Sequence, residues 1–263
     1  MLGAIIGDII GSPYEFESSK STDFQLFNEG CTPTDDSVMT VAVGCACTQA
    51  DIEDEWEFKA RVIYYMRKLG RLYPDAGYGG NFVLWLRDRN MGPYGSYGNG
   101  SAMRVSPVAW VADSLEQAET LAQWSAEVTH NHAEGIKGAR AVAAAIYLAR
   151  DGKDKDEIRA YIEEKYYDLD FTVDEIRPGY SFDVTCQGSV PQAIECFLEA
   201  EDYEEAVRLA VSLGGDGDTQ AAIAGAIAEA YFGIPSEIAE KGMEFIEGDL
   251  YDHYMEYSEQ LYK

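Results

Sequence analysis

The sequence predicts an all-α protein, a compact single-domain bundle of about a dozen helices that spans residues 1–263. Apolar residues recur at helical spacing almost throughout the chain, and strict alternation of apolar and polar residues is nearly absent. The one strand candidate, residues 182–186, is too short to seed a sheet with so little company. No repeat with a period of about 20 to 50 residues recurs, so a helical solenoid is not supported.

The first half of the chain contains predicted helices at residues 2–10, 37–50, 54–69, 81–89, 101–112, 115–129 and 133–150. Along the first helix, Gly3, Gly7 and Gly11 follow one another at four-residue spacing and form a ridge of small residues. Because such a ridge lets another helix approach closely, we expect the first helix to be buried. Ser114 and Gln117 resemble a capping box at the start of the sixth helix.

The second half contains predicted helices at residues 155–167, 191–200, 203–213, 219–232, 236–247 and 250–262. Pro191 suits the first turn of its helix, where a backbone N–H has no intrahelical acceptor. Ser236 is expected to cap the helix that begins there, after a stop signal at residues 233–235. The charged segment 151–157 is the best candidate for a domain boundary, yet it more simply joins two helices.

The charge balance excludes several classes of partner. Lys and Arg number 20 against 47 Asp and Glu, which gives a formal net charge of −27. Such a surface repels phosphate backbones and anionic lipids, so we expect neither general nucleic-acid binding nor a membrane-surface role.

The sequence also favours a cytoplasmic location. The five cysteines are odd in number and lack paired CxxC spacing, so they are interpreted as reduced core residues. The apolar stretch 2–10 has no basic region before it and carries Asp8, so it does not resemble a secretory signal. No apolar run reaches the roughly 18 residues needed to span a membrane.

Two short acidic blocks carry the strongest functional signal, Thr34-Asp35-Asp36 and Asp216-Gly217-Asp218-Thr219. Together they offer six hard oxygen ligands, and their four carboxylates would balance two divalent cations. Coordination by oxygen alone favours Mg²⁺, Mn²⁺ or Ca²⁺ over zinc or copper. Each block also stands just ahead of a predicted helix, where Thr and Asp are ordinary N-cap residues. The sequence therefore offers two interpretations, a two-metal site and a pair of helix caps.

Other residues could add to such a site. The Gly-rich loop 94–101 leads into a predicted helix and could bind phosphate through its amides, or it could be a surface turn. Glu15 follows the first helix and could hold a proton near the metals, or it could be a solvated loop acid. Asp75 lies in a Pro-Asp turn and could be a turn residue, a catalytic base or a substrate contact. His130 stands where one helix ends and another begins, so it could cap a helix or bind a ligand. No nucleophilic triad is evident.

Five motifs occur in order along the chain: Gly7-Asp8 with Gly11 and Glu15, Thr34-Asp35-Asp36-Ser37, Gly98-Asn99-Gly100-Ser101-Ala102-Met103-Arg104, Thr129-His130, and Gly214-Gly215-Asp216-Gly217-Asp218-Thr219. As a set they resemble the ADP-ribosylglycohydrolase family, which includes the dinitrogenase reductase-activating glycohydrolases. The resemblance covers nearly the whole chain. It implies an all-α fold, a binuclear Mg²⁺ or Mn²⁺ centre, and hydrolysis of the bond between the terminal ribose C1″ of ADP-ribose and an acceptor.

The resemblance also implies a role for each matching residue. The metal ligands would be Thr34, Asp35, Asp36, Asp216, Asp218 and Thr219. Glu15 would lie at the catalytic centre, and Glu15, Asp35 or Asp216 would take a proton from the attacking water. Asp75 resembles a proton-transfer acid of the nitrogenase-regulating members. Asn99, Gly100, Ser101, Ala102 and Met103 would cradle the diphosphate and distal ribose, with His130 beside them. Gly217 departs from the Ser or Ala expected there, which could loosen the loop.

The expected partner is an ADP-ribosylated protein or a small ADP-ribose conjugate. Arginine, serine, a base, an acetyl ester and a polymer all stay open as acceptors, with a preference for arginine-linked or small-molecule substrates. Loops 18–31 and 73–80 are expected to shape that choice. Two other functions compete with hydrolysis of the glycosidic bond. One is a non-catalytic, ADP-ribose-binding or crystallin-like member of the same fold, and the other is a two-metal phosphohydrolase.

Overall fold

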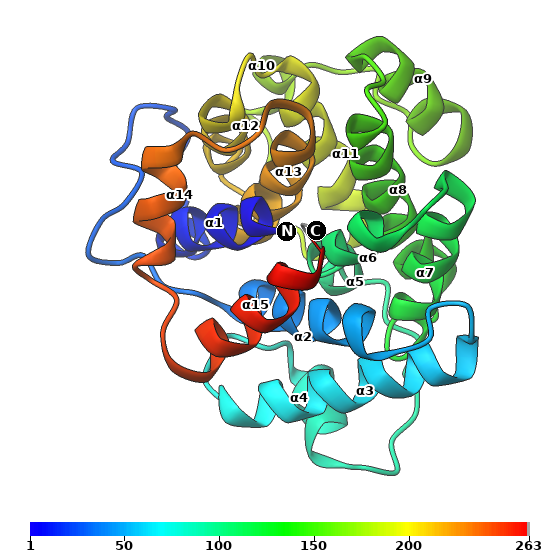
Figure 1. Ribbon diagram of the computed structural model, residues 1–263. Helices are drawn as coiled ribbons and strands as arrows, with labels where there is room; N and C mark the ends of the chain where they lie inside the picture. The colour runs from blue at the N-terminus through cyan, green and yellow to red at the C-terminus, as the bar shows by residue number, and fades with distance from the viewer. Residues whose placement is uncertain (262–263) are drawn as a thin grey trace.

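A computed structural model describes residues 1–261, and it confirms the all-α fold (Figure 1). Within these residues no strand is present, and the expected strand at 182–186 is reduced to an isolated bridge between Gly98 and Thr185. The helices are α1 (Leu2–Gly11), η1 (Ser12–Tyr14, a 3₁₀ helix), α2 (Asp35–Gln49), α3 (Glu55–Leu72), α4 (Gly80–Arg87), α5 (Gly100–Met103), α6 (Ser106–Val111), α7 (Leu115–Glu127), α8 (Ala133–Arg150), α9 (Lys155–Lys165), α10 (Val173–Ile176), α11 (Cys186–Glu199), α12 (Tyr203–Ser212), α13 (Gly217–Phe232), α14 (Ser236–Met243) and α15 (Gly248–Leu261).

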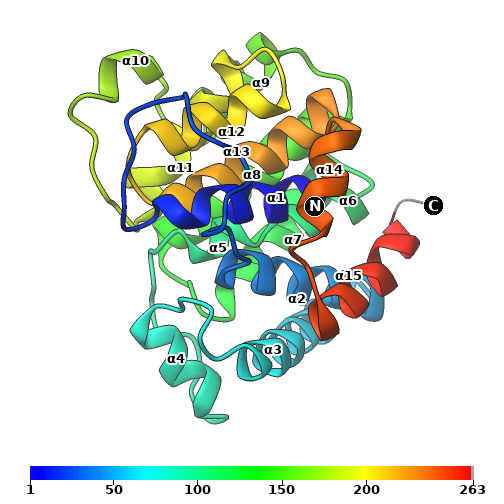
Figure 2. The same ribbon diagram turned by 90° about the vertical axis from the view of Figure 1, so that its left-hand side faces the viewer.

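The centre of the fold is the pair α1 and α13, which lie side by side in both views (Figures 1 and 2). The predicted ridge of glycines explains the contact. A Cβ atom at Gly3, Gly7 or Gly11 would lie less than 3.0 Å from a backbone carbonyl oxygen of α13. The expectation of a buried, closely approached first helix is therefore confirmed, because every residue from Gly3 to Gly11 is buried.

One continuous hydrophobic core surrounds this pair. It includes side chains from Met1 to Tyr257, so both ends of the described chain contribute to it. The helix α2 is buried on nearly every face, and the ring of Tyr257 in α15 packs directly over its Gly44. The helices α3 and α4 form the lower edge of the molecule in both views (Figures 1 and 2).

The single helix expected at 101–112 is wrong, because α5 ends at Met103 and α6 begins at Ser106. Pro107 supplies the reason. Its ring has no N–H to donate to Met103, and it clashes with a helical carbonyl four residues earlier. The chain therefore turns between the two short helices, and Arg104 lies at the turn.

The expected start at Pro191 is also wrong, because α11 begins at Cys186. Thr185 is the true N-cap, and its hydroxyl accepts a hydrogen bond of 3.1 Å from the Gly188 amide. Pro191 lies inside the helix, where it removes one hydrogen bond without ending the helix. Likewise Ser236 is the first residue of α14 and makes no side-chain cap among the described residues. The cap at Ser114 is confirmed, since its hydroxyl accepts from the Gln117 amide at 3.1 Å.

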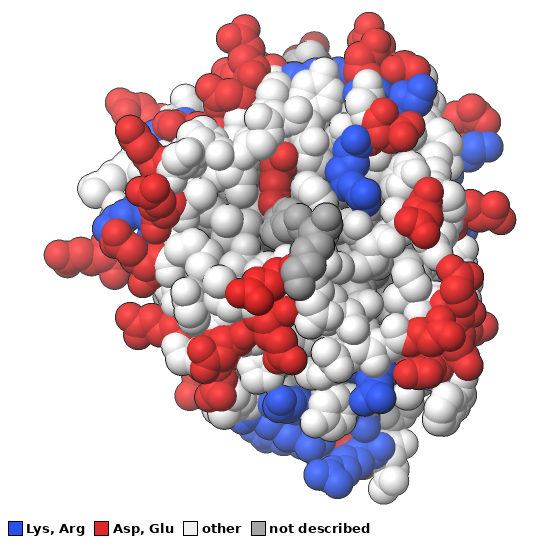
Figure 3. Space-filling model, viewed as in Figure 1, with Lys and Arg blue, Asp and Glu red and all other residues white. Residues whose placement is uncertain are grey.

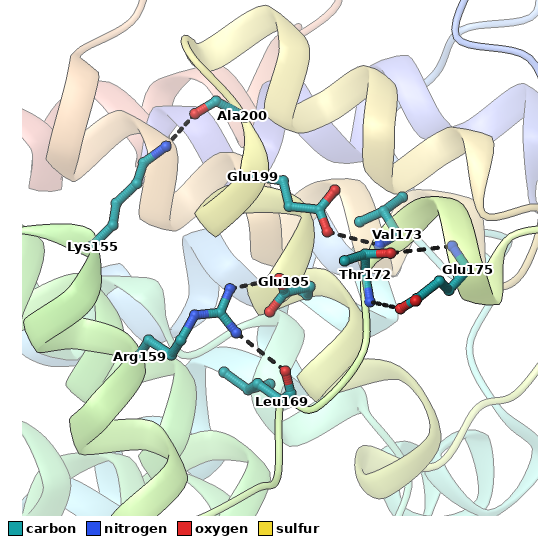
Figure 4. A network of polar contacts seen from close by, with 9 residues as sticks. All are labelled: Lys155, Arg159, Leu169, Thr172, Val173, Glu175, Glu195, Glu199 and Ala200. Carbon is teal, nitrogen blue, oxygen red and sulfur yellow. Dashed lines mark hydrogen bonds and ion pairs between the residues drawn. The ribbon is translucent and has the colours of Figure 1, made fainter.

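Polar contacts tie α9 and α10 to α11, on the side of the molecule away from α3 and α4 (Figures 1 and 4). The Arg159 guanidinium donates to the buried Glu195 carboxylate at 2.6 Å and to the Leu169 carbonyl at 3.2 Å. Glu199 accepts from the first amide of α10, that of Val173, at 2.8 Å. The segment 151–157 joins α8 to α9, and α9 is held against α11 by these contacts.

Charge is unevenly distributed over the surface. Acidic side chains form separate groups in Figure 3, mainly around the rim of the face, whereas basic side chains gather at its lower edge, over α3 and α4. These two helices contain Lys59, Arg61, Arg67, Lys68, Arg71 and Arg87. Among residues 1–261, no helix combines the length and apolar character needed to cross a bilayer.

Candidate metal centre and active site

Both acidic blocks border one cavity of about 360 Å³. Its walls come from the residue after η1, the starts of α2, α4 and α13, the short helix α5, and the loops before α4, α5, α8 and α11. The residues that line it are Glu15, Asp35, Asp36, Gly77, Gly79, Gly80, Asn81, Phe82, Tyr94, Ser96, Gly98, Asn99, Gly100, Met103, Arg104, His130, Val184, Asp216, Asp218 and Thr219. The fold therefore brings together two blocks that lie at opposite ends of the sequence.

The first block forms the start of α2. Thr34 is the N-cap residue, and its hydroxyl accepts a hydrogen bond of 3.3 Å from the Asp36 amide. The Asp35 amide donates to the Ala76 carbonyl at 2.7 Å, which anchors the block to the loop before α4. Asp35 is half-buried and Asp36 is buried, so both carboxylates are held in place at the edge of the cavity.

The second block forms the start of α13. Gly214 has a φ of +63°, a conformation that favours glycine, and it turns the chain ahead of Asp216. Asp216 occupies the N-cap position, yet among the described residues its side chain caps no amide and instead accepts from Asn99 Nδ2 at 2.7 Å. The Thr219 hydroxyl donates to Asp36 Oδ2 at 3.1 Å and so links the two blocks directly.

The donor set fits divalent cations. Carboxylate oxygens of Asp8, Asp36 and Asp218 lie within 4.8 Å of one another, and so do those of Glu15, Asp216 and Asp218. Asp36 Oδ1 is buried and has no hydrogen-bond partner among residues 1–261. A buried carboxylate oxygen without a partner is costly unless a cation compensates it. Helix capping explains the position of Thr34, but it explains neither the two groups of neighbouring carboxylates nor the unpaired oxygen of Asp36.

Electrostatics agree with that assignment. Burial raises the pKa of Asp36 and of Asp218 well above the usual value, and neighbouring carboxylates raise each pKa further. Asp35 shows the same direction for the same two reasons. Positive charge at the centre would relieve this repulsion, because an opposite charge nearby favours the ionised carboxylate.

Asp8 is a residue of the site to which sequence reasoning gave no role. It is fully buried, and its Oδ2 accepts from the amides of Thr34 at 2.9 Å and Ser37 at 3.0 Å. The hydroxyls of the same two residues also donate to Asp8, that of Thr34 at 2.6 Å. With four donors satisfied, Asp8 holds the first block in place. The available signal was an acidic residue in the middle of an otherwise apolar helix.

Glu15 lies at the cavity, one residue beyond η1, and is half-buried. Burial raises its pKa to about 7, with further contributions from the charges of Asp216 and Asp8. The structure thus places Glu15 beside the second acidic cluster, where the sequence predicted a carboxyl group able to hold a proton.

The predicted substrate residues divide into two groups. Asn99, Gly100, Met103 and His130 line the cavity. Ser101 and Ala102 are fully buried and do not line it, and the Ser101 hydroxyl donates to the Gly135 carbonyl at 2.7 Å. These two residues therefore lie behind the wall of the cavity.

Asp75 is not brought into this cavity. Its side chain is exposed and lines a second cavity of about 390 Å³, together with Tyr73, Phe245 and others. The neighbouring Ala76 carbonyl contacts the first block through its backbone alone. Sequence reasoning also gave no individual role to the wall residues Asn81, Phe82 and Val184, because nothing in their local sequence marks them.

Comparisons with known proteins agree with this geometry. A family model described as ADP-ribosylglycohydrolase matches residues 1–263. The ADP-ribosylhydrolase ARH3 of Bos taurus is 27% identical over 326 residues, which covers 94% of this chain and 87% of the relative. The ADP-ribosylarginine hydrolase Tri1 of Pseudomonas putida (strain GB-1) is 28% identical, covering 92% of this chain and 72% of the relative.

A solved structure described as an ADP-ribosylglycohydrolase-related protein complex has the same fold. Its TM-score is 0.68 at 22% identity, with 99% of this chain and 96% of that chain covered. The family model spans the entire sequence, and the acidic blocks that carried the resemblance meet at one cavity. This chain therefore belongs to the ADP-ribosylglycohydrolase family.

Proposed function

We propose that this protein hydrolyses the C1″ glycosidic bond that joins ADP-ribose to an acceptor, and that it releases free ADP-ribose. The observation that carries the proposal is the meeting of both acidic blocks at one cavity, with the buried Asp36 Oδ1 left without a protein partner among residues 1–261. The relatives named ADP-ribosylhydrolase support the same class of reaction.

Two divalent cations, Mg²⁺ or Mn²⁺, are part of the proposal. Thr34, Asp35, Asp36, Asp216, Asp218 and Thr219 would hold them. When bound, such ions supply positive charge that orients the terminal ribose diol and lowers the pKa of water towards neutrality. The protein contributes rigidity, because Asp8 fixes the first block and Asn99 fixes Asp216.

Proton transfer falls to the carboxylates around the cavity. Glu15 approaches from η1 and lies beside Asp216 and Asp218, so it is placed to accept a proton from the attacking water. Asp35 and Asp216 are the other candidates named by the sequence. We favour Glu15 as the base. Asp216 already accepts a hydrogen bond from Asn99, and Asp35 belongs to the block at the start of α2 that would hold the metal ions.

The remaining walls would bind the rest of ADP-ribose. Gly98, Asn99 and Gly100 line the cavity, and His130 lies beside them. The four-residue α5 is too short to develop a strong dipole, so diphosphate binding rests on individual amides and side chains. Tyr94, which also lines the cavity, offers a ring for a base or sugar.

The acceptor would leave through the mouth of the cavity. Phe16 follows Glu15, and Phe182 lies two residues before the wall residue Val184; both rings are exposed, with centroids 6.2 Å apart. A planar guanidinium stacks well on aromatic rings, and the acidic surroundings favour a cation. An arginine-linked acceptor on a protein or small molecule is therefore preferred, in agreement with the name of the Pseudomonas relative.

We also propose a cytoplasmic location for the protein. All five cysteines are free thiols and buried, which suits a reducing compartment.

The test is detection of products by mass spectrometry from ADP-ribosyl-arginine, ADP-ribosyl-serine and O-acetyl-ADP-ribose, each with Mg²⁺, Mn²⁺ or chelator. We expect free ADP-ribose to appear only with metal. Release of phosphate or a nucleotide would indicate a two-metal phosphohydrolase instead. Tight binding of ADP-ribose with no product from any substrate would indicate a non-catalytic member of the fold.

The matched variants are Asp36→Asn and Asp54→Asn. Asp54 is a true N-cap, which accepts from the Glu57 amide at 3.0 Å outside the cavity, and asparagine caps equally well. We expect Asp36→Asn to lower turnover by at least about 100-fold, because a charged metal ligand is lost. Asp54→Asn should leave turnover unchanged. Equal activity of the two variants would contradict the two-metal assignment.

A further inference from the structure

Behind His130 lies a buried chain of polar groups that the proposed reaction does not use directly. Arg104 is 1% exposed, and Nη2 of its guanidinium donates to the Ser125 carbonyl at 3.1 Å and to Thr129 Oγ1 at 3.0 Å. Thr129 is fully buried, and its Oγ1 lies 2.7 Å from His130 Nδ1. The chain therefore runs from Arg104 through Thr129 to the imidazole at the wall of the cavity.

The direction of each hydrogen bond follows from the chemistry of the groups. An arginine guanidinium is permanently protonated and can only donate, so Thr129 Oγ1 must accept from Arg104. Thr129 has one hydroxyl proton to donate. Within residues 1–261, the only hydrogen-bond partners of Oγ1 are the Arg104 guanidinium and His130 Nδ1, so the proton has an acceptor only if Nδ1 accepts it.

The alternative arrangement is unfavourable. A proton on His130 Nδ1 would point at Thr129 Oγ1, which would then accept two bonds and keep a buried hydroxyl proton without an acceptor. A buried donor left without a partner costs free energy. Burial lowers the pKa of His130 well below its usual value, and the nearby Arg104 charge lowers it further, so the imidazole is neutral.

The other ring nitrogen, Nε2, lies beside two glycines that line the cavity. A Cβ atom at Gly100 would lie 3.2 Å from Nε2, and one at Gly98 would lie 3.7 Å from it. Neither glycine has a side chain to cover Nε2, and Nε2 makes no hydrogen bond with any part of the chain that the structure describes. Tyr94, whose ring centroid lies 6.1 Å from that of His130, lines the same part of the cavity.

We propose that Arg104 and Thr129 are positioning residues that hold His130 as the neutral tautomer protonated at Nε2, a fixed hydrogen-bond donor to an oxygen of the bound ligand. The identity of that ligand as ADP-ribose rests on the proposed function. The tautomer of His130 is independent of it, because it follows from the hydrogen bonds of Arg104 and Thr129. A donor without net charge suits this place, because Arg104 already supplies positive charge behind it.

The tautomer can be read directly by NMR. The protein has three histidines, so protein labelled with ¹⁵N-histidine gives a simple long-range ¹H–¹⁵N spectrum, assigned with His132→Gln and His253→Gln. We expect His130 to show a protonated Nε2 and an unprotonated Nδ1 at neutral pH. Addition of ADP-ribose should shift the Nε2 signal. An imidazolium, or a protonated Nδ1, in the wild-type protein would overturn the proposal.

Thr129→Val and Thr129→Ser form the matched pair of variants. Valine removes the hydroxyl at nearly constant volume, so we expect mixed tautomers and an affinity for ADP-ribose, measured by calorimetry, weakened about fivefold to tenfold. Serine keeps the hydroxyl, and it should retain the tautomer and affinity within about twofold. A valine variant with the wild-type spectrum and affinity would overturn the proposal. If it does not fold, the wild-type and serine spectra decide.

Failure of the proposed function gives a different result. If wild-type protein binds no ADP-ribose, the ligand assignment and the glycohydrolase function fail together. The tautomer of His130 would still be visible in the same spectrum, so the two conclusions are tested separately.

Discussion

Thr34 and Asp216 both stand one residue ahead of a helix, but only Thr34 caps its helix with its side chain. The difference lies in their neighbours. Asn99 reaches Asp216 from α5 and draws its carboxylate away from the α13 amides. Residue type and position alone could not separate the two roles, because both residues are good N-caps.

Asp8 provides a test of positioning at the residue scale. In Asp8→Asn, an amide NH₂ group replaces one of two oxygens that together accept four hydrogen bonds from Thr34 and Ser37. At least one donor then loses its acceptor, so we expect a loss of about 1–3 kcal/mol in the free energy of unfolding. Because the first block also shifts, affinity for Mn²⁺ should fall about tenfold or more.

Denaturant unfolding and isothermal titration with Mn²⁺ measure the two effects. Asp54→Asn serves as the control, since it makes the same chemical change at an exposed cap. Wild-type metal affinity in Asp8→Asn would show that Asp8 does not position the first block.

At the scale of helices, the crossing of α1 and α13 determines the geometry of the site. The helix α1 carries Asp8 and leads to Glu15, while α13 begins beside Asp216 and Asp218. Gly217 fits this arrangement, because a Cβ atom there would lie 3.3 Å from the backbone of Tyr14. Glycine at the position where the family resemblance suggests Ser or Ala thus lets η1 lie close to the second block.

Gly7→Ala tests the crossing. The added methyl group would overlap the backbone of Ala221, which cannot move as a side chain could. We expect a loss of about 2–4 kcal/mol in the free energy of unfolding, measured by denaturant titration. Gly92→Ala is the control, because a methyl group at that position would meet no described atom within 4 Å and should change stability little. Similar stabilities of the two variants would argue against a tight crossing.

Two prolines show where helix prediction succeeds and fails. Pro107 separates α5 from α6, whereas Pro191 lies within α11. Both lack an N–H, so local chemistry is the same. The helix α11 tolerates its proline because it is capped by Thr185 and most of its length is buried in the core. Tertiary packing therefore decides which proline ends a helix.

At the scale of the whole molecule, negative charge dominates both the surface and the site. The net charge is −27. At the site, Glu15 lies close to five other buried or half-buried carboxylates, those of Asp8, Asp35, Asp36, Asp216 and Asp218. Mutual repulsion among them opposes folding when no cation is bound. Divalent cations should therefore stabilise the folded protein, whereas monovalent salt at the same ionic strength should do so much less.

The thermal midpoint measures this effect. At about 100 times the dissociation constant, a bound ion contributes about 2.7 kcal/mol. For a chain of this size that corresponds to a rise of about 5–10 °C in Tm with Mg²⁺ or Mn²⁺. In the absence of divalent ions, Asp36→Asn should have a higher Tm than the wild type. When Mg²⁺ or Mn²⁺ is added, its Tm should increase much less than that of the wild type. A Tm that is insensitive to divalent ions would contradict a binuclear centre.

The sequence by itself determined the helical class, the residue types of the site and the family resemblance. Helical periodicity is a local property, and so are the oxygen donors in each acidic block. The glycine ridge of α1 even predicted the close helix approach, because four-residue spacing places small residues on one face.

Only the tertiary structure decided which of these residues act together. Asp36 and Thr219 are 183 residues apart and meet only because α1 packs against α13 next to α2. The same packing made Asp8 a support and turned Asp75 towards a different cavity. It also aligned Arg104, Thr129 and His130. Side-chain direction depends on neighbours that are remote in sequence, and no local pattern encodes it.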